Sequence, residues 1–264
     1  MQDMSSETES ALLAYLRQTP RFMEMNTVVI IQARLGSTRL PRKVTMDLAG
    51  KSMIEWVIAR AGKISGVDQV VVATTMLSED DELVAFLAGV CPVFRGPSQD
   101  VLRRYRIAAD AVDATAVIRV TSDCPLLCPE VSGEIVRAFH EATVDYASNT
   151  MVRVYPRGLD TEVFSTDVLR QADDEATDPA EREHVTPFIY RRPERFRLLP
   201  VASGMDHSNL RWTVDTPEDL QLARRLLVAL KADGMEGTYA ELLELIREHP
   251  EWSALNEKVS QKPV

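Results

Sequence analysis

A chain of 264 residues with 45% hydrophobic residues is long enough to bury the core of one large domain. Its formal net charge of -10 repels polyanions, so we expect no nucleic acid among its partners. The apolar run at 11–16 is too short for the core of a signal peptide or for a membrane span, so we expect no membrane partner either.

The chain has three cysteines, Cys91, Cys124 and Cys128. This odd number suits the reducing cytoplasm better than a disulfide framework. Cys124 and Cys128 have a separation found in metal sites, but no second pair of Cys or His at suitable spacing completes a zinc site. We therefore expect a cytoplasmic protein without structural zinc.

The first half of the chain alternates between strand and helix patterns. Residues 1–25 form an N-terminal extension, either one short helix or disordered. The run TVVIIQ at 27–32 is continuously apolar and β-branched, which is typical of a strand buried on both faces of a parallel sheet. A loop at 33–43 leads to a helix at 52–64, with Ser52 as its cap. Further strands are expected at 69–75, 93–95 and 116–122, and helices at 79–88, 98–112 and 129–142.

The second half is less regular. Strands are expected at 145–149, 161–165 and 196–201, with helices near Val168 and Glu181, and this pattern predicts antiparallel strands within the sheet. A strand at 210–214 then precedes a helix that Thr216 caps, that has Pro217 in its first turn and that ends near Leu230. A last helix covers 239–247. No clear linker divides the chain, so we expect one compact α/β domain.

The loop after the first strand is unusually basic for so acidic a chain. Residues 34–51 hold five cations and one acid: Arg34, Arg39, Arg42, Lys43 and Lys51 against Asp47. A loop that leaves the carboxyl end of a parallel strand lies where α/β sheets bind ligands. Gly36, Ser37 and Thr38 allow backbone amides to approach an anion, which the cations neutralise. The loop therefore predicts a polyphosphate site; the alternative is a solvated basic loop, since the spacing matches neither a P-loop nor GxGxxG.

Two aspartates directly follow predicted strands. Asp123 follows the predicted strand at 116–122, and Asp215 follows the one at 210–214, in WTVDTPEDL. Carboxylates suit Mg²⁺, a hard cation that takes few protein oxygens and completes its shell with water and phosphate. The two aspartates could share one metal ion, although Asp123 could instead cap the turn at Pro125. Asp219 is expected to favour the first turn of its helix through the helix dipole.

Seven stretches occur in order along the chain: VIIQARLGSTRLPRK, GKSMIEWVIARA, FRGPSQDVLRRY, VIRVTSDCPLL, GLDTEVFS, EREHVTPFIY and LRWTVDTPEDL. Together they resemble the CMP-KDO synthetase and acylneuraminate cytidylyltransferase superfamily, most closely its branch of spore coat polysaccharide biosynthesis protein F homologues. The resemblance covers about 28–230. It implies a Rossmann-like α/β nucleotidyltransferase fold of the glycosyltransferase A type, with a mainly parallel central sheet. It also implies a nucleotidyltransferase domain at 26–232, a C-terminal helical extension at 233–264 and a homodimer.

The resemblance assigns site residues by matching position. The nucleotide set is Ala33, Arg34, Gly36, Ser37, Arg39, Lys43, Ser98, Asp100 and Asp123, of which Arg39, Lys43 and Asp123 are the catalytic residues. The metal set, for Mg²⁺, is Asp123 and Asp215. The acceptor set is Arg157, Asp160, Glu162, Arg182, Glu183 and His184. A structural role within its helix is the alternative for His184. Val101 stands where better-known synthetases have an arginine, and Arg42 where a glycine is common.

These expectations combine into one function. The chain should transfer CMP from CTP to a sugar acid or related small acceptor and release pyrophosphate, with Mg²⁺, in surface polysaccharide biosynthesis. One alternative is a glycosyltransferase of the same fold class, which would use a nucleotide-sugar donor, although so many cations suit a triphosphate better than a diphosphate. The other alternative is a non-catalytic nucleotide-binding subunit, against which the basic loop and both aspartates argue.

Overall fold

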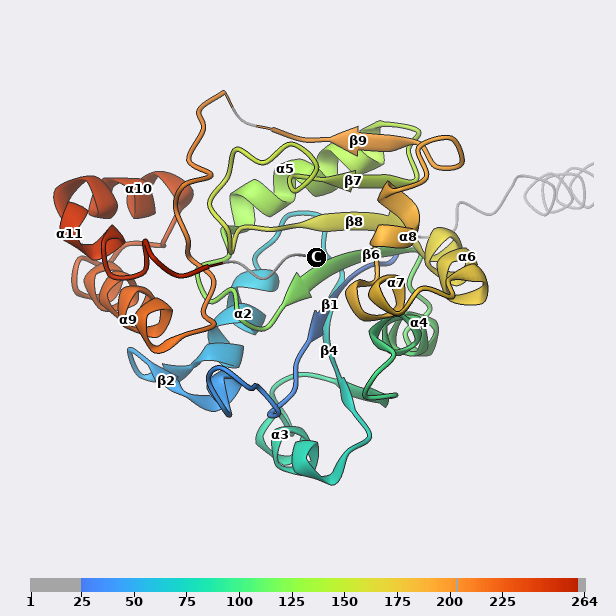
Figure 1. Cartoon of the computed structure of the whole chain (residues 1–264), viewed down its shortest axis with the longest axis horizontal. Helices are drawn as coiled ribbons and strands as arrows, with labels where there is room; N and C mark the ends of the chain where they lie inside the picture. The colour runs from blue at the N-terminus through green and yellow to red at the C-terminus, as the bar shows by residue number, and fades with distance from the viewer. Residues whose placement is uncertain (1–24, 203, 261–264) are drawn as a thin grey trace, which may run out of the picture.

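The computed structural model describes residues 25–202 and 204–260, so the expected extension at 1–25 lies almost wholly outside the described residues. Within that part of the chain, seven strands form one sheet in the order β5-β4-β1-β6-β8-β7-β9 (Figure 1). Their bounds are β1 Thr27–Gln32, β4 Gln69–Thr75, β5 Val93–Gly96, β6 Ala116–Thr121, β7 Tyr146–Ser148, β8 Glu162–Ser165 and β9 Leu198–Pro200. The strands from β5 to β6 are parallel, and β8 is antiparallel to both β6 and β7. The predicted α/β fold with a mixed second half is confirmed.

The helices cover both faces of this sheet. Their bounds are α2 Met53–Ala61, α3 Asp81–Phe86, α4 Val101–Ala111, α5 Pro129–Glu141, α6 Thr166–Glu175, α7 Pro179–His184, α8 Pro187–Tyr190, α9 Pro217–Ala232, α10 Tyr239–Glu248 and α11 Pro250–Ser253. On β1, Val29 and Ile31 join a core with α2, α5 and α9, whereas Val28 and Ile30 join a second core with α4, α6 and α8. Successive strand residues face opposite sides, so an uninterrupted apolar run such as β1 requires a helix layer on each side.

Local sequence signals set several helix boundaries. Ser52 caps α2 in a reciprocal capping box with Glu55, and Thr216 caps α9 in the same way with Asp219. The helix expected at 98–112 begins later, at Val101, because the Asp100 side chain accepts a hydrogen bond from the backbone of Arg103. The helix expected at 79–88 divides into a 3-10 turn, Ser78–Asp80, followed by α3.

The strand predicted at 210–214 is wrong. Within the described part of the chain, the only β-bridge of these residues is an isolated one between Arg211 and Arg157. Their backbone partners lie in loops rather than in a strand: the amide of Trp212 donates to the oxygen of Arg157 at 2.6 Å, and the amide of Val214 donates to that of Asp123 at 2.8 Å. The segment therefore joins two loops and brings the residues after it beside Asp123.

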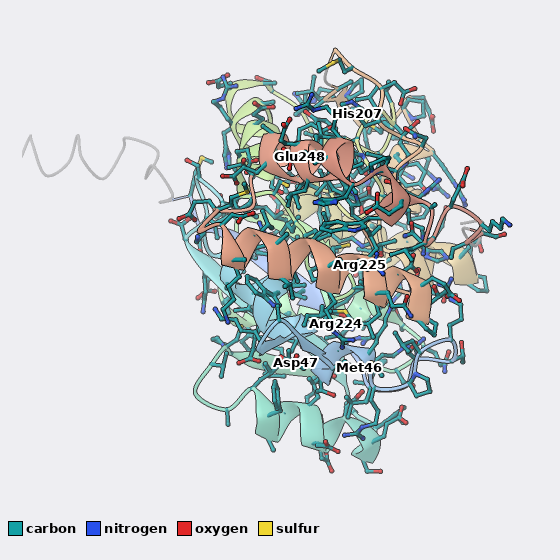
Figure 2. All side chains as sticks on the ribbon, turned by 90° about the vertical axis from the view of Figure 1, so that its left-hand side faces the viewer. Met46, Asp47, His207, Arg224, Arg225 and Glu248 are labelled. Atoms are coloured by element: carbon teal, nitrogen blue, oxygen red, sulfur yellow. The ribbon has the colours of Figure 1, made fainter. Side chains whose placement is uncertain are left out.

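The C-terminal helices α9, α10 and α11 gather on the left of Figure 1, away from α4, α6 and α7. A two-stranded hairpin, β2 Asp47–Leu48 with β3 Lys51–Ser52, lies below them. Arg224 of α9 donates a hydrogen bond to the backbone oxygen of Asp47 at 2.8 Å, and the two residues lie side by side in Figure 2. This contact ties the C-terminal helices to the end of the basic loop.

The cysteines and the helices can be compared with what the sequence predicts for disulfides and membrane spans. Cys91, Cys124 and Cys128 are all buried and free. None of the helices in residues 25–202 and 204–260 is both long and apolar enough to cross a membrane.

Candidate active site

A cleft of about 440 Å³ opens at the carboxyl ends of β1 and β6. Its walls come from the basic loop, the segment before α4, the end of β6, the loop at 157–160, the end of α7 and the segment before α9. This is the edge at which parallel α/β sheets bind ligands. The basic loop is anchored there by Asp80, a fully buried acid whose Oδ1 accepts a hydrogen bond from the backbone amide of Leu35 at 2.7 Å.

Lys43 joins the two predicted metal aspartates. It begins a 3-10 helix, Lys43–Thr45, within the basic loop. Its Nζ lies 3.1 Å from Asp123 Oδ2 and 2.9 Å from Asp215 Oδ1, and it also donates to the backbone oxygen of Val214 at 2.8 Å. The structure thus brings together three residues that lie far apart in the sequence.

Burial and pairing act in opposite directions on these charges. Burial alone lowers the pKa of Lys43, but the carboxylates of Asp123 and Asp215 outweigh it and raise that pKa above its usual value. Burial works to raise the pKa of Asp123, yet the Lys43 ammonium and the Thr121 hydroxyl hold that pKa below its usual value. Lys43 and Asp123 are therefore both charged at neutral pH.

Asp215 is surrounded by cations. Its Oδ2 lies 2.9 Å from Arg39 and 2.8 Å from Arg211, while Lys43 contacts the other oxygen. Arg211 is held in turn by Asp219, whose Oδ1 lies 2.9 Å from the Arg211 Nε. Asp219 also accepts a hydrogen bond from the Asp215 backbone amide at 2.9 Å. Asp219 thus orients Arg211 and the start of α9 behind the cleft.

The cleft gathers most of the predicted site residues. Those at its walls are Ala33, Arg34, Gly36, Ser37, Arg39, Lys43, Ser98, Asp123, Arg157, Asp160, Glu183, His184 and Asp215. Burial is the largest influence on His184 and lowers its pKa below the usual value. This imidazole is therefore neutral at neutral pH. Three predicted residues, Asp100, Glu162 and Arg182, do not reach the cleft wall.

Asp100 and Arg182 bind each other instead. The Nε of Arg182 donates to Asp100 Oδ1 at 3.0 Å, and its Nη2 donates to Asp173 Oδ1 at 2.7 Å. Ser98 and Gln99, which come just before Asp100, line the cleft. Glu183, which directly follows Arg182, lines it as well. The ion pair therefore joins the two walls that were expected to hold the nucleoside and the acceptor.

Glu162 lies beneath the cleft and holds Arg119. It is only 5% exposed, and it accepts hydrogen bonds from Arg119, Thr186 and Tyr146, the last at 2.6 Å. Burial works to lower the pKa of Arg119, but the Glu162 carboxylate outweighs burial and raises that pKa above its usual value. The guanidinium therefore stays charged. Arg119 itself lines the cleft, so Glu162 orients a cleft residue rather than forming the wall.

Sequence reasoning missed part of the cleft wall. The missed residues are Gln32, Val44, Gln99, Val101, Arg104, Arg119, Thr121, Ser122, Cys124, Gly158 and Thr213, whereas Thr38 of the basic loop lies at the wall as expected for the polyphosphate site. Arg119 carried a usable signal, because it is the one charged residue in the otherwise apolar start of AVIRVT. Gly158 has φ +106, and a Cβ there would come within 2.6 Å of the Thr213 backbone nitrogen, so only glycine fits.

Arg42, which stands where the resemblance has a common glycine, adopts a backbone conformation that suits glycine. Its φ of 59 and ψ of 19 lie in the left-handed region that glycine favours. Its side chain pairs with Glu82 outside the cleft. The loop therefore makes a left-handed turn at Arg42, and this side chain adds no cation to the cleft wall.

The chain is similar to known proteins over most of its length. Residues 28–252 match the family model described as Cytidylyltransferase. The chain is 32% identical to the uncharacterized protein MJ1063 of Methanocaldococcus jannaschii, covering 90% of this chain and 97% of that protein. It is 30% identical to the spore coat polysaccharide biosynthesis protein SpsF of Bacillus subtilis, covering 86% of this chain and 97% of that protein.

Solved structures show the same fold. A cytidylyltransferase from Leptospira borgpetersenii superposes with a TM-score of 0.80 at 28% identity, covering 91% of this chain and all of that one (100%). A CMP:2-keto-3-deoxy-manno-octonic acid synthetase solved in complex with CTP superposes with a TM-score of 0.59 at 22% identity, covering 80% of this chain and 100% of that one. The family model spans most of the chain and the cleft residues alike, and the chain therefore belongs to the cytidylyltransferase family.

Proposed function

We propose that this protein transfers CMP from CTP to a small sugar-like acceptor and releases pyrophosphate. The observation that carries the proposal is the cluster that Lys43 of the basic loop forms with Asp123 and Asp215 at the ligand-binding edge of the sheet. Family membership supports the cytidylyl donor, and the fold neighbour solved with CTP binds that nucleotide on the same architecture.

The cleft offers a triphosphate several matched partners. Arg34, Arg39 and Lys43 line it together with backbone at Gly36 and Ser37, so cationic and amide donors converge on one wall. Cationic donors form stronger hydrogen bonds with phosphate oxygens than neutral ones do. We assign the phosphates of CTP to this wall and the nucleoside to the side of Ala33 and Ser98.

The two aspartates fit a Mg²⁺ ion. Both present hard carboxylate oxygens within 3.1 Å of one cation, the Lys43 ammonium, so one small cation can be shared between them. No group of three carboxylate, His or Cys side chains forms a closed metal cage in residues 25–202 and 204–260. Mg²⁺ needs none, because it keeps water and phosphate oxygens in its shell. When bound by Asp123 and Asp215, it would neutralise charge on the phosphates.

The reaction is an in-line displacement at phosphorus. The oxygen of an acceptor hydroxyl forms a bond to the α-phosphorus and gives up its proton to solvent, while the bond from that phosphorus to the bridging oxygen breaks and pyrophosphate leaves with the electron pair. Arg39 and Lys43 stabilise the charge that develops on the leaving group. Asp123 has a lowered pKa and is therefore a weak base, so its main role is electrostatic.

The acceptor is assigned to the other end of the cleft. Arg157, Asp160, Glu183 and His184 line that part, and Arg119 adds a cation that Glu162 orients. Polar groups of both signs suit a sugar acid, whose carboxylate and hydroxyls need charged and neutral partners. The similarity to SpsF supports a role in making a surface polysaccharide.

Lys43→Ala tests the phosphate assignment. Loss of one cationic donor should weaken CTP binding by about 30-fold, whereas CMP, which lacks the β- and γ-phosphates, should lose less than about threefold. Isothermal titration in EDTA measures both dissociation constants without a contribution from metal. Lys63→Ala removes an exposed lysine outside the cleft and is the matched control. Equal losses for CTP and CMP would contradict the assignment.

A further inference from the structure

Every hydrogen-bond donor of the Lys43 ammonium is already used. The group has three N–H donors, and it meets three acceptors: Val214 O at 2.8 Å, Asp215 Oδ1 at 2.9 Å and Asp123 Oδ2 at 3.1 Å. The Lys43 side chain is 11% exposed. We call this arrangement the Lys43 bridge. It places a fixed positive charge between the two carboxylates that are proposed to hold the metal ion.

The remaining carboxylate oxygens are occupied as well. Asp123 Oδ1 accepts a hydrogen bond from the Thr121 hydroxyl at 2.6 Å, and Asp215 Oδ2 meets Arg39 at 2.9 Å and Arg211 at 2.8 Å. With Asp219 bound to Arg211, the cluster holds three carboxylates and three cations. A divalent cation that arrives alone therefore meets a neutral cluster and must break the Lys43 bridge to reach both aspartates.

A triphosphate changes this balance. Lys43 and Arg39 belong to the basic loop and line the cleft, whereas Arg211 is held behind it by Asp219. Phosphate oxygens in the cleft can therefore draw Lys43 and Arg39 away from the aspartates and leave Arg211 in place. The two carboxylates then regain unpaired oxygens at the moment when a metal-binding polyphosphate lies beside them.

We propose that the Lys43 bridge keeps divalent cations out of the free protein, so that the metal ion is bound only together with a nucleoside triphosphate. The proposal rests on the proposed function, because it concerns the same metal site. By thermodynamic linkage, the triphosphate must tighten the metal by the same factor by which the metal tightens the triphosphate. The bridge also predicts an unusual effect of substitution: removal of a cation should create a metal site in the free protein.

The test measures Mn²⁺ binding by electron paramagnetic resonance, which counts free Mn²⁺ directly and needs no acceptor or turnover. Wild type should bind Mn²⁺ weakly alone and at least about tenfold more tightly with CTP, after correction for Mn²⁺ bound to CTP in solution. Lys43→Met should bind Mn²⁺ alone at least about tenfold more tightly than wild type, because Asp123 Oδ2 and Asp215 Oδ1 each lose their cationic partner and become open to the metal ion. Lys63→Met, which removes an exposed lysine paired with Glu236, should behave as wild type.

Two further variants locate the effect. Lys43→Gln keeps an amide donor toward the aspartates without the charge, and it should also gain Mn²⁺ affinity if Lys43→Met fails to fold. Adding Asp123→Asn to either variant should remove the gain, because the metal has lost one of its two carboxylates.

The outcomes separate the two proposals. Equal Mn²⁺ affinity in wild type and both Lys43 variants, with tight binding once CTP is present, would overturn the role of the bridge alone. Tight Mn²⁺ binding by the free wild type would overturn it too. Absence of protein-bound Mn²⁺ in every variant, with and without CTP, would overturn the metal site of the proposed function itself.

Discussion

Asp123→Asn should lower the rate of pyrophosphate release by about 10³-fold and leave the fold intact. The substitution removes one of two carboxylates that are proposed to hold the metal ion, and a metal ion contributes several kcal/mol of charge stabilisation in such reactions. Asp123 is bound through Lys43 and Thr121 at the edge of the sheet, so the core beneath it does not depend on its charge. Steady-state kinetics at saturating Mg²⁺ and CTP measure the rate, and circular dichroism checks the fold.

Two further variants serve as comparisons for Asp123→Asn. Asp206→Asn changes an exposed aspartate outside the cleft and should keep full activity. Asp215→Asn should lose activity as Asp123→Asn does, and it should also lose some stability, because Asp215 pairs with Arg39, Lys43 and Arg211. If both cleft variants fail to fold, the two aspartates are structural residues and the metal assignment is wrong.

Glu162→Gln should lower the free energy of unfolding by about 3 kcal/mol, because breaking a buried ion pair leaves an uncompensated charge in the interior. Arg119 has Glu162 as its anionic partner, and the Glu162 side chain is 6% exposed against 16% for Arg119. The neutral amide keeps the size of the carboxylate but removes its charge. Urea denaturation of wild type and variant measures the difference.

The matched control is Glu175→Gln, which disrupts the exposed ion pair with Arg195. Water and salt screen such surface pairs, so its effect should be much smaller than that of Glu162→Gln. Identical denaturation midpoints for Glu162→Gln and the control would show that Glu162 does not hold Arg119 in the way described here.

The sequence predicted the fold because its main signals are local. The run TVVIIQ became β1 at its expected residues, and QVVVATT became β4, since each apolar, β-branched run is buried on both faces of the sheet. Asp123 follows β6, and the parallel order of β4, β1 and β6 brings it to the edge where the basic loop begins. The segment at 210–214, LRWTV, alternates apolar and polar residues as a strand does, but its partners are loops, which no local pattern reveals.

The sequence alone does not reveal which long charged side chains pair with one another. Arg182 lies beside Glu183 and was expected to bind the acceptor, yet it turns to Asp100, a partner 82 residues away. Arg119 and Glu162 became partners only because β6 and β8 pair antiparallel in a register that places them side by side. The Lys43 bridge is of the same kind, since it depends on three segments that meet only in the folded chain.

The most direct test of the central claim is pyrophosphate release by the purified protein with CTP, UTP, ATP or GTP, Mg²⁺, and a panel of sugar acids and amino sugars. We predict release that requires both Mg²⁺ and an acceptor from the panel and that is selective for CTP. Equal release from all four nucleotides, or release unaffected by EDTA, would contradict the assignment of this protein as a metal-dependent transferase of CMP.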